Sequence, residues 1–212
     1  MIKVLIVDDH PLVREGLKKV VSQRTTNIKV VGEASSANQL MEKLSASLPD
    51  IVILDIAMPG KSGLDVLKEI KEYYPHLPVL ILSMHPEDRF AIRALKAGAS
   101  GYLTKSSISD QLVKAIKKIV TKKKKYISQS LAEELAERVD SHSEKPLHES
   151  LSDREYQILC MIASGKKVND IAKELSLSVQ TVHTYRSRIK DKTGLNTNVD
   201  LTRYALHNNL ID

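Results

Sequence analysis

The sequence predicts an α/β domain with a parallel sheet, followed by a smaller all-α domain. In the first part of the chain, short apolar runs alternate five times with segments of helical periodicity. This alternation is typical of a (βα)5 unit, in which helices cover both faces of a parallel sheet. After about residue 150 the periodicity is helical throughout. A length of 212 residues is sufficient for two domains, each with a core of its own.

The five apolar runs are the expected strands. Consecutive β-branched and leucine side chains suit strands that are buried on both faces. The runs occupy residues 3–7, 28–34, 51–55, 79–83 and 101–104. We expect the flavodoxin-like strand order 2-1-3-4-5, in which the first and third strands are neighbours and the chain reverses direction between them.

The segments between the strands have the apolar spacing of helices. In the first of them, Leu17, Val20 and Val21 recur on one helix face. Helical spacing recurs over residues 64–74, 90–95 and 112–119, and Pro75 and Gly98 end two of these helices. The α/β domain is therefore expected to occupy residues 1–127.

Residues 128–150 are expected to form a linker that contains a short helix. Residues 128–138 are acidic with helical spacing, whereas residues 140–150 are polar, contain a proline and have no period. The all-α domain then occupies residues 151–212. Ser152 and Glu155 have the spacing of a capping box, which starts a helix that runs to Ala163. Further helices are expected over residues 168–175, 179–193 and 199–208.

Composition places the chain among ordinary globular proteins. Hydrophobic residues make up 42% of the sequence and charged residues 27%, and no apolar run approaches the length of a membrane span. The single cysteine, Cys160, has apolar neighbours typical of a core residue and cannot form a disulfide within the chain. We therefore expect a cytoplasmic protein without a membrane anchor.

The net charge of +6 is weak support for nucleic-acid binding because of where it lies. Residues 1–127 carry 21 Lys and Arg against 13 Asp and Glu, whereas residues 151–212 carry 9 against 7. Seven lysines fall in residues 114–125, where they suit the negative end of a helix. DNA binding must therefore be argued from motifs.

Three carboxylates are expected to meet at one edge of the sheet. Asp8 and Asp9 follow the first strand, and Asp55 ends the third. Because these strands are neighbours, their carboxyl ends border one crevice. Close acids repel one another, and a hard divalent cation with oxygen ligands relieves the repulsion, which predicts a Mg²⁺ site. Taken alone, Asp55 fits equally well a solvated residue at the end of a strand.

Two further polar residues lie at the carboxyl ends of the remaining strands. Ser83 ends the fourth strand and could donate a hydrogen bond to a phosphoryl oxygen, and Lys105 follows the fifth and could supply a positive charge. Beside Mg²⁺, one carboxylate could then act as the nucleophile in phosphoryl transfer. Each residue alone has an ordinary structural explanation, but the placement of all of them at strand ends favours a site.

These residues resemble the receiver domains of two-component response regulators. The matching segments are DDHP at residues 8–11, LDIAMPG at 54–60, Ser83, AGA at 97–99 and GYLTK at 101–105. The resemblance implies that Asp55 accepts a phosphoryl group from a sensor histidine kinase. It also implies that Asp8, Asp9 and Asp55, with the backbone carbonyl of Ala57, bind Mg²⁺.

The same resemblance implies roles for residues that respond to phosphorylation. Ser83 and Lys105 would contact the phosphoryl group, and Tyr102 would be the aromatic side chain whose inward or outward rotamer accompanies switching. Many receivers have proline after the lysine, where this sequence has Ser106. Whether the peptide bond after Lys105 is cis stays open, because without proline a cis bond costs about 3 kcal/mol.

Residues 171–189 have the apolar spacing of two helices joined by a tight turn, which predicts a helix-turn-helix. On the second helix Val182, Tyr185 and Ile189 share one face, and a polar set occupies the other. The alternative is a plain helical bundle with a solvated polar face. Residues 151–208 resemble the LuxR-type domain of NarL/FixJ regulators, through Leu151, Ser152, Arg154, Glu155, Gly165, Ile171, Ala172, Leu175, Thr181, Val182, Ile189, Lys192 and Gly194.

This second resemblance implies how the domain meets double-stranded DNA. His183, Thr184 and Ser187 would face base edges, and Thr181, Arg186, Arg188 and Lys192 would contact phosphates. Family members usually have lysine where this chain has His183, so base preference does not carry over. The last helix, with Val199, Leu201 and Tyr204, corresponds to the family's dimerisation helix, although its apolar face could instead be core.

We therefore expect a transcription regulator, not an enzyme, that is phosphorylated on Asp55 with Mg²⁺, then forms a homodimer and binds DNA. One alternative is a regulator that binds DNA without phosphorylation and uses the receiver as a dimerisation scaffold. A less favoured alternative is a Mg²⁺-dependent phosphohydrolase with an aspartyl-phosphate intermediate. Phosphohydrolases that resemble haloacid dehalogenases have a second acid two residues after the nucleophile, where this chain has Ala57.

Overall fold

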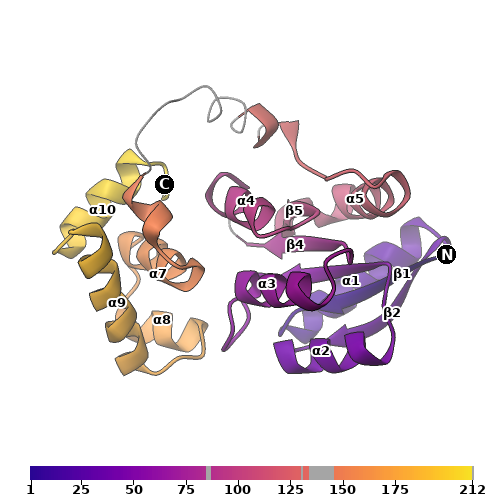
Figure 1. The fold of residues 1–212 in the computed structure, drawn as a ribbon, viewed down its shortest axis with the longest axis horizontal. Coiled ribbons are helices and arrows are strands. Elements are labelled where there is room, and N and C mark those ends of the chain that lie inside the picture. Colours follow the sequence, from indigo (N-terminus) through magenta and orange to yellow (C-terminus); the bar gives the residue numbers. More distant parts are fainter. Residues whose placement is uncertain (85–86, 130, 134–145, 212) are drawn as a thin grey trace. The chain divides into compact units, whose positions relative to one another are not determined.

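The computed structural model of the chain describes residues 1–84, 87–129, 131–133 and 146–211 (Figure 1). It divides into two compact units, residues 1–140 and residues 141–212. The division falls inside the predicted linker of residues 128–150. Of the short acidic helix predicted there, residues 129 and 131–133 are helical, and residues 134–138 lie outside the described residues.

The first unit is built on a five-stranded parallel sheet. Its strands are β1 (Ile2–Val7), β2 (Ile28–Ala34), β3 (Ile51–Asp55), β4 (Val79–Ser83) and β5 (Gly101–Thr104). They lie in the order β2-β1-β3-β4-β5, with every neighbouring pair parallel, which confirms the predicted order. All the strand carboxyl ends therefore lie at one edge of the sheet.

Helices cover both faces of the sheet (Figure 1). They are α1 (Pro11–Arg24), α2 (Ala37–Ala46), α3 (Gly63–Tyr73), α4 (Glu87–Lys96) and α5 (Ile108–Lys122). On one face, Ile51 and Ile53 of β3 share a buried cluster with Leu17 of α1 and Ile116 of α5. Because strand side chains alternate, Val52 and Leu54 point to the other face. Each fully buried aliphatic side chain stabilises the fold by about 2 kcal/mol, so the sheet is the rigid frame of the unit.

The second unit is helical. It contains the 3-10 turn η2 (Leu147–Ser150) and the helices α7 (Asp153–Ala163), α8 (Val168–Glu174), α9 (Val179–Thr193) and α10 (Asn198–His207). The predicted capping box forms at Ser152 and Glu155, and Ser178 caps α9 by accepting a hydrogen bond from the Thr181 N–H. Gly194 ends α9 in the left-handed conformation, with φ of +72°.

The predicted linker extends too far at its carboxyl end. Residues 147–150 form η2 and belong to the second unit, because His148 is 7% exposed and contacts two aromatic side chains. Its Nδ1 lies 2.9 Å from the Tyr204 hydroxyl, its backbone N–H donates to the same oxygen at 3.1 Å, and its ring lies 5.7 Å from that of Tyr156. Leu147, Glu149 and Ser150 are exposed, and the segment has no apolar period, so the burial of His148 is a product of tertiary packing alone.

Candidate phosphorylation site and nucleic-acid interface

Two buried carboxylates and one partly buried carboxylate meet at the carboxyl edge of the sheet. Asp8 and Asp55 are each 1% exposed, because they follow or end strands that the helices cover on both faces. Asp9 keeps 24% of its side chain exposed. One ligand atom from each of these acids and from His10 lies within 4.8 Å of the others. The adjacency of β1 and β3 therefore brings the predicted acids together.

Lys105 crosses from the end of β5 to bridge the two buried acids. Its Nζ donates to Asp8 Oδ2 at 2.7 Å and to Asp55 Oδ2 at 2.9 Å, and its side chain is 10% exposed. The second oxygen of Asp55, Oδ1, accepts the Ala57 N–H at 3.2 Å. One ammonium group thus pairs with two carboxylates. When both acids are ionised, Asp8, Asp55 and Lys105 together carry a net negative charge.

The pKa directions follow from this arrangement. Burial raises the pKa of Asp55 above its ordinary value, and the charge of Lys105 only partly opposes the rise. Burial also lowers the pKa of Lys105, but the carboxylates of Asp55 and Asp8 outweigh it and leave the pKa raised. Lys105 is therefore held in its charged form, while ionised Asp55 lacks full compensation.

Ser83 and Tyr102 are both buried, on the neighbouring strands β4 and β5. Ser83 is completely buried at the carboxyl end of β4, in register with Thr104 of β5. Tyr102 is also completely buried, so its ring is in the inward arrangement. The described residues contain no cis peptide bond, so the bond between Lys105 and Ser106 is trans.

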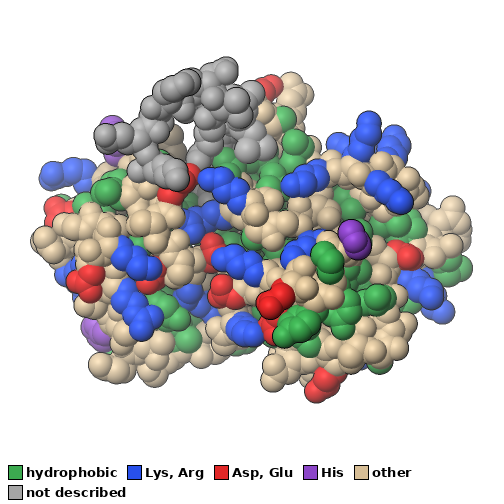
Figure 2. All heavy atoms as spheres, in the orientation of Figure 1, with side chains coloured by type: hydrophobic (Ala, Val, Ile, Leu, Met, Phe, Trp, Pro, Cys, Tyr) green, Lys and Arg blue, Asp and Glu red, His purple; other side chains and the backbone are tan. Residues whose placement is uncertain are grey.

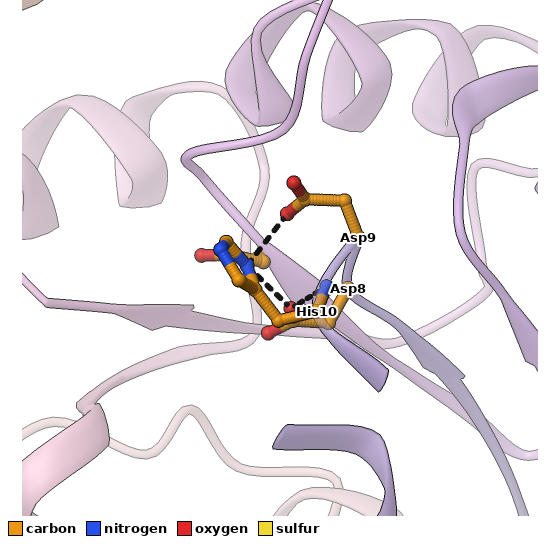
Figure 3. Close-up of side chains that lie close together, drawn as sticks. Asp8, Asp9 and His10 are labelled. Atoms are coloured by element: carbon orange, nitrogen blue, oxygen red, sulfur yellow. Dashed lines mark hydrogen bonds and ion pairs between the residues drawn. The ribbon is translucent and has the colours of Figure 1, made fainter. Parts of the chain in front are cut away.

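His10 is a member of the acidic cluster that the sequence interpretation missed (Figure 3). Its Nδ1 lies 3.0 Å from Asp9 Oδ1 and 3.4 Å from Asp8 Oδ1, and its backbone N–H donates to Asp8 Oδ1 at 2.8 Å. The only signal in the sequence is that it directly follows the two acids. A protonated His10 would add a second cation beside Lys105.

Gly63, the first residue of α3, is the other residue that the sequence interpretation missed. A Cβ added there would lie 2.2 Å from the carbonyl oxygen of Asp55 and 2.6 Å from the Cα of Ile56. The Gly63 N–H donates to the Ile56 carbonyl at 3.0 Å. Only glycine allows α3 to pack this closely on the backbone that carries Asp55.

The donor set fits a hard divalent cation. It offers three carboxylates, and Asp9 Oδ1 is a buried oxygen that accepts no hydrogen bond. That atom lies 3.0 Å from Nδ1 of His10. A hard divalent cation, which prefers oxygen ligands, would compensate the charge of this carboxylate.

The exposed face of α9 has the predicted polarity. Val182 and Ile189 are completely buried, whereas His183, Thr184, Ser187 and Arg188 are exposed. Thr181 and Arg186 are half-buried. The Arg188 guanidinium lies 5.9 Å from the centre of the Tyr185 ring, which orients it along the helix surface. The helix therefore presents a polar and basic surface of the kind that enters a DNA groove.

Lys192 has a protein partner that the sequence interpretation did not find. Its Nζ donates to Glu155 Oε2 at 2.7 Å, and the same oxygen accepts the Ser152 N–H at 2.7 Å. Glu155 is 3% exposed, whereas the Lys192 side chain is 42% exposed. Besides any contact with phosphate, Lys192 thus joins α9 to the start of α7.

The residues predicted for dimerisation differ in their exposure. Val199 is 65% exposed, but Leu201 is completely buried in the core of its own unit. Leu201 therefore offers no surface to a second chain, because its side chain faces the other helices of the unit. Tyr204 is half-buried and holds η2 through its hydroxyl.

Two known families together cover most of the chain. The family described as "Response regulator receiver domain" matches residues 4–117, and the family described as "Bacterial regulatory proteins, luxR family" matches residues 149–205. The chain is a response regulator of the NarL/FixJ type.

Relatives of this response regulator match it from end to end. Response regulator UvrY of Escherichia coli O6:H1 is 36% identical over 211 residues, which cover 99% of this chain and 96% of UvrY. Response regulator GacA of Pseudomonas protegens is 37% identical over 212 residues, which cover 100% of this chain and 99% of GacA.

Solved structures of RcsB also resemble the response regulator over nearly its whole length. The structure of an RcsB–DNA complex has a TM-score of 0.60 and 28% identity, with 97% of this chain and 98% of that chain covered. A second structure is that of RcsB from Salmonella enterica serovar Typhimurium bound to promoter rprA in the presence of the phosphomimetic BeF3-. It has a TM-score of 0.64 and 26% identity, with 96% of this chain and 97% of that chain covered.

The response regulator therefore combines a receiver with a LuxR-type DNA-binding domain and regulates transcription. In the part of the chain that the structure describes, every helix is too short or too polar to cross a membrane. The acidic cluster is the receiver's candidate metal site, and α9 is the candidate DNA-reading helix.

Proposed function

We propose that a sensor histidine kinase phosphorylates Asp55 with Mg²⁺, and that the phosphorylated protein dimerises and binds an operator in double-stranded DNA. The observation that carries the proposal is the pairing of two acids, each 1% exposed, with the single Lys105 ammonium. A carboxylate that could act as the nucleophile thus lies beside a charged ammonium group. Mg²⁺ held by Asp8, Asp9, Asp55 and the backbone carbonyl of Ala57 would offset the negative charge of a phosphoryl group.

The residues of the chain suggest how the transfer proceeds. A carboxylate oxygen of Asp55 attacks phosphorus, the bond from phosphorus to the kinase imidazole nitrogen breaks, and the nitrogen keeps the electron pair. Lys105 already lies 2.9 Å from Asp55 Oδ2, so a short movement brings its ammonium to a phosphoryl oxygen. The Ser83 hydroxyl, at the end of the neighbouring strand, would donate a second hydrogen bond.

Transfer also changes the charge balance that holds the site. Lys105 now shares its charge between Asp8 and Asp55, and a phosphoryl group would compete for it. The loss of the bridge to Asp8 would favour a receiver conformation with a different arrangement around Ser83 and the inward Tyr102 ring. Phosphorylation would therefore shift an existing equilibrium toward a form that dimerises.

The DNA contact is assigned to α9. Its exposed His183, Thr184 and Ser187 are within reach of base edges when the helix lies in the major groove. Thr181, Arg186, Arg188 and Lys192 would contact phosphates, and Val199 of α10 would lie at the dimer contact. The resemblance to RcsB structures that contain DNA supports this assignment.

The test compares phosphorylation and DNA binding in matched variants. An operator is first selected from random duplexes with the native protein treated with acetyl phosphate and Mg²⁺. We expect the native protein to gain the mass of one phosphoryl group and to bind the selected duplex at least about tenfold more tightly after treatment. Asp55→Ala should do neither, whereas Asp110→Ala, which removes an acid with 78% of its side chain exposed, should behave as the native protein.

Two other results would contradict the proposal in different ways. Equal affinity with and without labelling of Asp55 would make the protein a phosphorylation-independent regulator with the receiver as a scaffold. Turnover of phosphate esters over many cycles per second would make it a phosphohydrolase. Against that activity, the position two residues after Asp55 is Ala57, whose side chain offers no general acid.

A further inference from the structure

The receiver has a pocket at the edge of the sheet opposite the acidic cluster. Residues that directly precede strands, Asp50, Pro78 and Ser100, line it together with the carboxyl end of α5. Its volume of about 450 Å³ falls in the range of small-molecule sites. None of the residues assigned to phosphorylation or to DNA contact lines it.

The pocket is strongly basic. Lys123, Lys124 and Lys125 all line it, and the described residues provide no carboxylate at ion-pair distance from these three lysines. The only acid on its wall is Asp50, which already accepts the Lys3 backbone N–H at 2.7 Å. The carboxyl end of α5 adds roughly half a negative charge, so the wall keeps a positive charge of about 1.5.

The surrounding groups agree with this excess of positive charge. Burial lowers the pKa of Lys71, and the charge of Lys125 lowers it further. The Lys71 ammonium donates to the Leu77 carbonyl at 2.5 Å, so it has an oxygen partner but no carboxylate there. Figure 2 shows Lys and Arg side chains gathered over the part of the molecule where α5 lies.

The backbone holds the three lysines in place. Lys123 ends α5 in the left-handed conformation, with φ of +51°. Just after the three lysines, the Tyr126 N–H donates to the Ser100 carbonyl at 2.8 Å, and Tyr126 pairs with Gly101 as a parallel bridge. Residues 123–125 are therefore held between a helix end and the edge strand β5, so they line one pocket.

The pocket also has an apolar wall. Pro78, Ile119 and Val120 supply it, and Ile119 is 4% exposed and belongs to the core. The imidazole of His76 and the hydroxyl of Ser100 add polar groups at the boundary. A flat organic group can pack on the apolar wall while its phosphates meet the lysines.

We propose that this pocket binds a phosphorylated small molecule with a flat apolar body, of the nucleotide class. Phosphates would pair with Lys123, Lys124 and Lys125, and the base would lie against Pro78 and Val120. The carboxylate of Asp50 would accept hydrogen bonds from hydroxyl or amino groups of the ligand. The ligand would join the end of α5 to the β5 edge of the sheet.

The test uses ATP, inorganic tripolyphosphate and adenosine as probes of the full-length protein by titration calorimetry, with a chelator present to remove divalent cations. Native protein should bind one ATP per chain, and bind tripolyphosphate and adenosine more weakly. The triple variant Lys123→Gln, Lys124→Gln, Lys125→Gln should bind ATP at least about tenfold more weakly. Its matched control, Lys19→Gln, Lys29→Gln, Lys43→Gln, removes three exposed lysines from α1, β2 and α2, and should bind ATP within about twofold of native.

Each other outcome overturns the proposal. Equal weakening in both triple variants would mean attraction to net charge without a site. Tripolyphosphate binding as tight as that of ATP would mean that the apolar wall takes no part. The triple variant at Lys123, Lys124 and Lys125 should keep the helix content and unfolding midpoint of native protein. If such a folded variant bound ATP as tightly as native protein, ATP would bind outside this pocket.

Discussion

At the scale of the residue, the receiver is built on an imbalance of charge. Asp8 and Asp55 are both buried, and they share one lysine. Buried charges without full compensation reduce stability, and such strain is common at functional sites. The imbalance prepares the site for a cation and for a phosphoryl group.

Replacement of Asp55 by asparagine should stabilise the protein at neutral pH. Burial raises the pKa of Asp55 in the folded state, so ionised Asp55 costs stability once the pH exceeds the unfolded pKa of about 3.9. Without divalent cations, Asp55→Asn should therefore raise the free energy of unfolding at pH 7.5 by on the order of 1 kcal/mol. Urea unfolding at pH 7.5 and pH 4.5 measures this difference in the free energy of unfolding, which should be smaller at the lower pH. If Asp55→Asn were less stable than native protein at pH 7.5, the buried charge of Asp55 would not be destabilising.

Gly63 should tolerate no side chain. Because an added Cβ would meet the carbonyl of Asp55 at 2.2 Å, Gly63→Ala should reduce the free energy of unfolding by about 2 kcal/mol or more and slow the labelling of Asp55 by acetyl phosphate. Gly16→Ala is the matched control, since nothing lies within 4 Å of its added Cβ inside α1. The free energy of unfolding of that control should rise by about 0.5 to 1 kcal/mol, and acetyl phosphate should label its Asp55 at the native rate. Equal stability of the two variants would show that α3 can move away from Asp55.

At the scale of the element, the start of α7 determines how α9 is held. The capping box places Glu155 where it accepts the Ser152 N–H, and Lys192 of α9 donates to the same oxygen. The pKa of Glu155 is lowered: burial alone would raise it, but the Lys192 and Ser152 hydrogen bonds outweigh burial. One carboxylate thus caps one helix and anchors another.

Glu155→Gln should lose stability in a pH-dependent way. A carboxyl whose pKa is lower in the folded state stabilises the fold above its unfolded pKa of about 4.3, and this contribution disappears as the pH falls through the folded value. We expect a loss of about 1 kcal/mol at pH 7 and a smaller loss at pH 3.5, which is below the unfolded pKa. Unfolding at both pH values, followed by circular dichroism, measures this difference in stability. Glu174→Gln, which removes an exposed partner of Lys166, should change stability by less than about 0.5 kcal/mol.

At the scale of the whole molecule, the boundary of the DNA-binding unit lies earlier than periodicity indicates. The turn η2 packs on α10 through His148 and Tyr204, and the second unit begins in the residues that precede it. The chain that leads into the DNA-binding domain is therefore fixed to the helix that carries the exposed Val199.

A fragment of residues 146–212 should consequently be more stable than one of residues 151–212. The shorter fragment loses two contacts with the Tyr204 hydroxyl and the packing of His148 on Tyr156, together worth about 2 kcal/mol. Thermal unfolding of the two fragments measures the difference. His148→Ala in the longer fragment should reproduce most of the loss, and identical melting temperatures for all three would restore the boundary at residue 151.

The sequence by itself determined the parts of this protein that depend on local pattern. Apolar runs and helical periods predicted the strands and helices, and acids at strand ends predicted the cluster of Asp8, Asp9 and Asp55. Residue order is sufficient for these inferences, because a parallel sheet places every strand's carboxyl end at one edge.

Only the tertiary structure decided which side chains from distant elements touch. It packed Gly63 on the backbone of Asp55, and it buried Leu201 and His148 in the second unit. It also paired Lys192 with Glu155, 37 residues away in sequence. These contacts depend on how helices pack on their neighbours, and no local period records that packing.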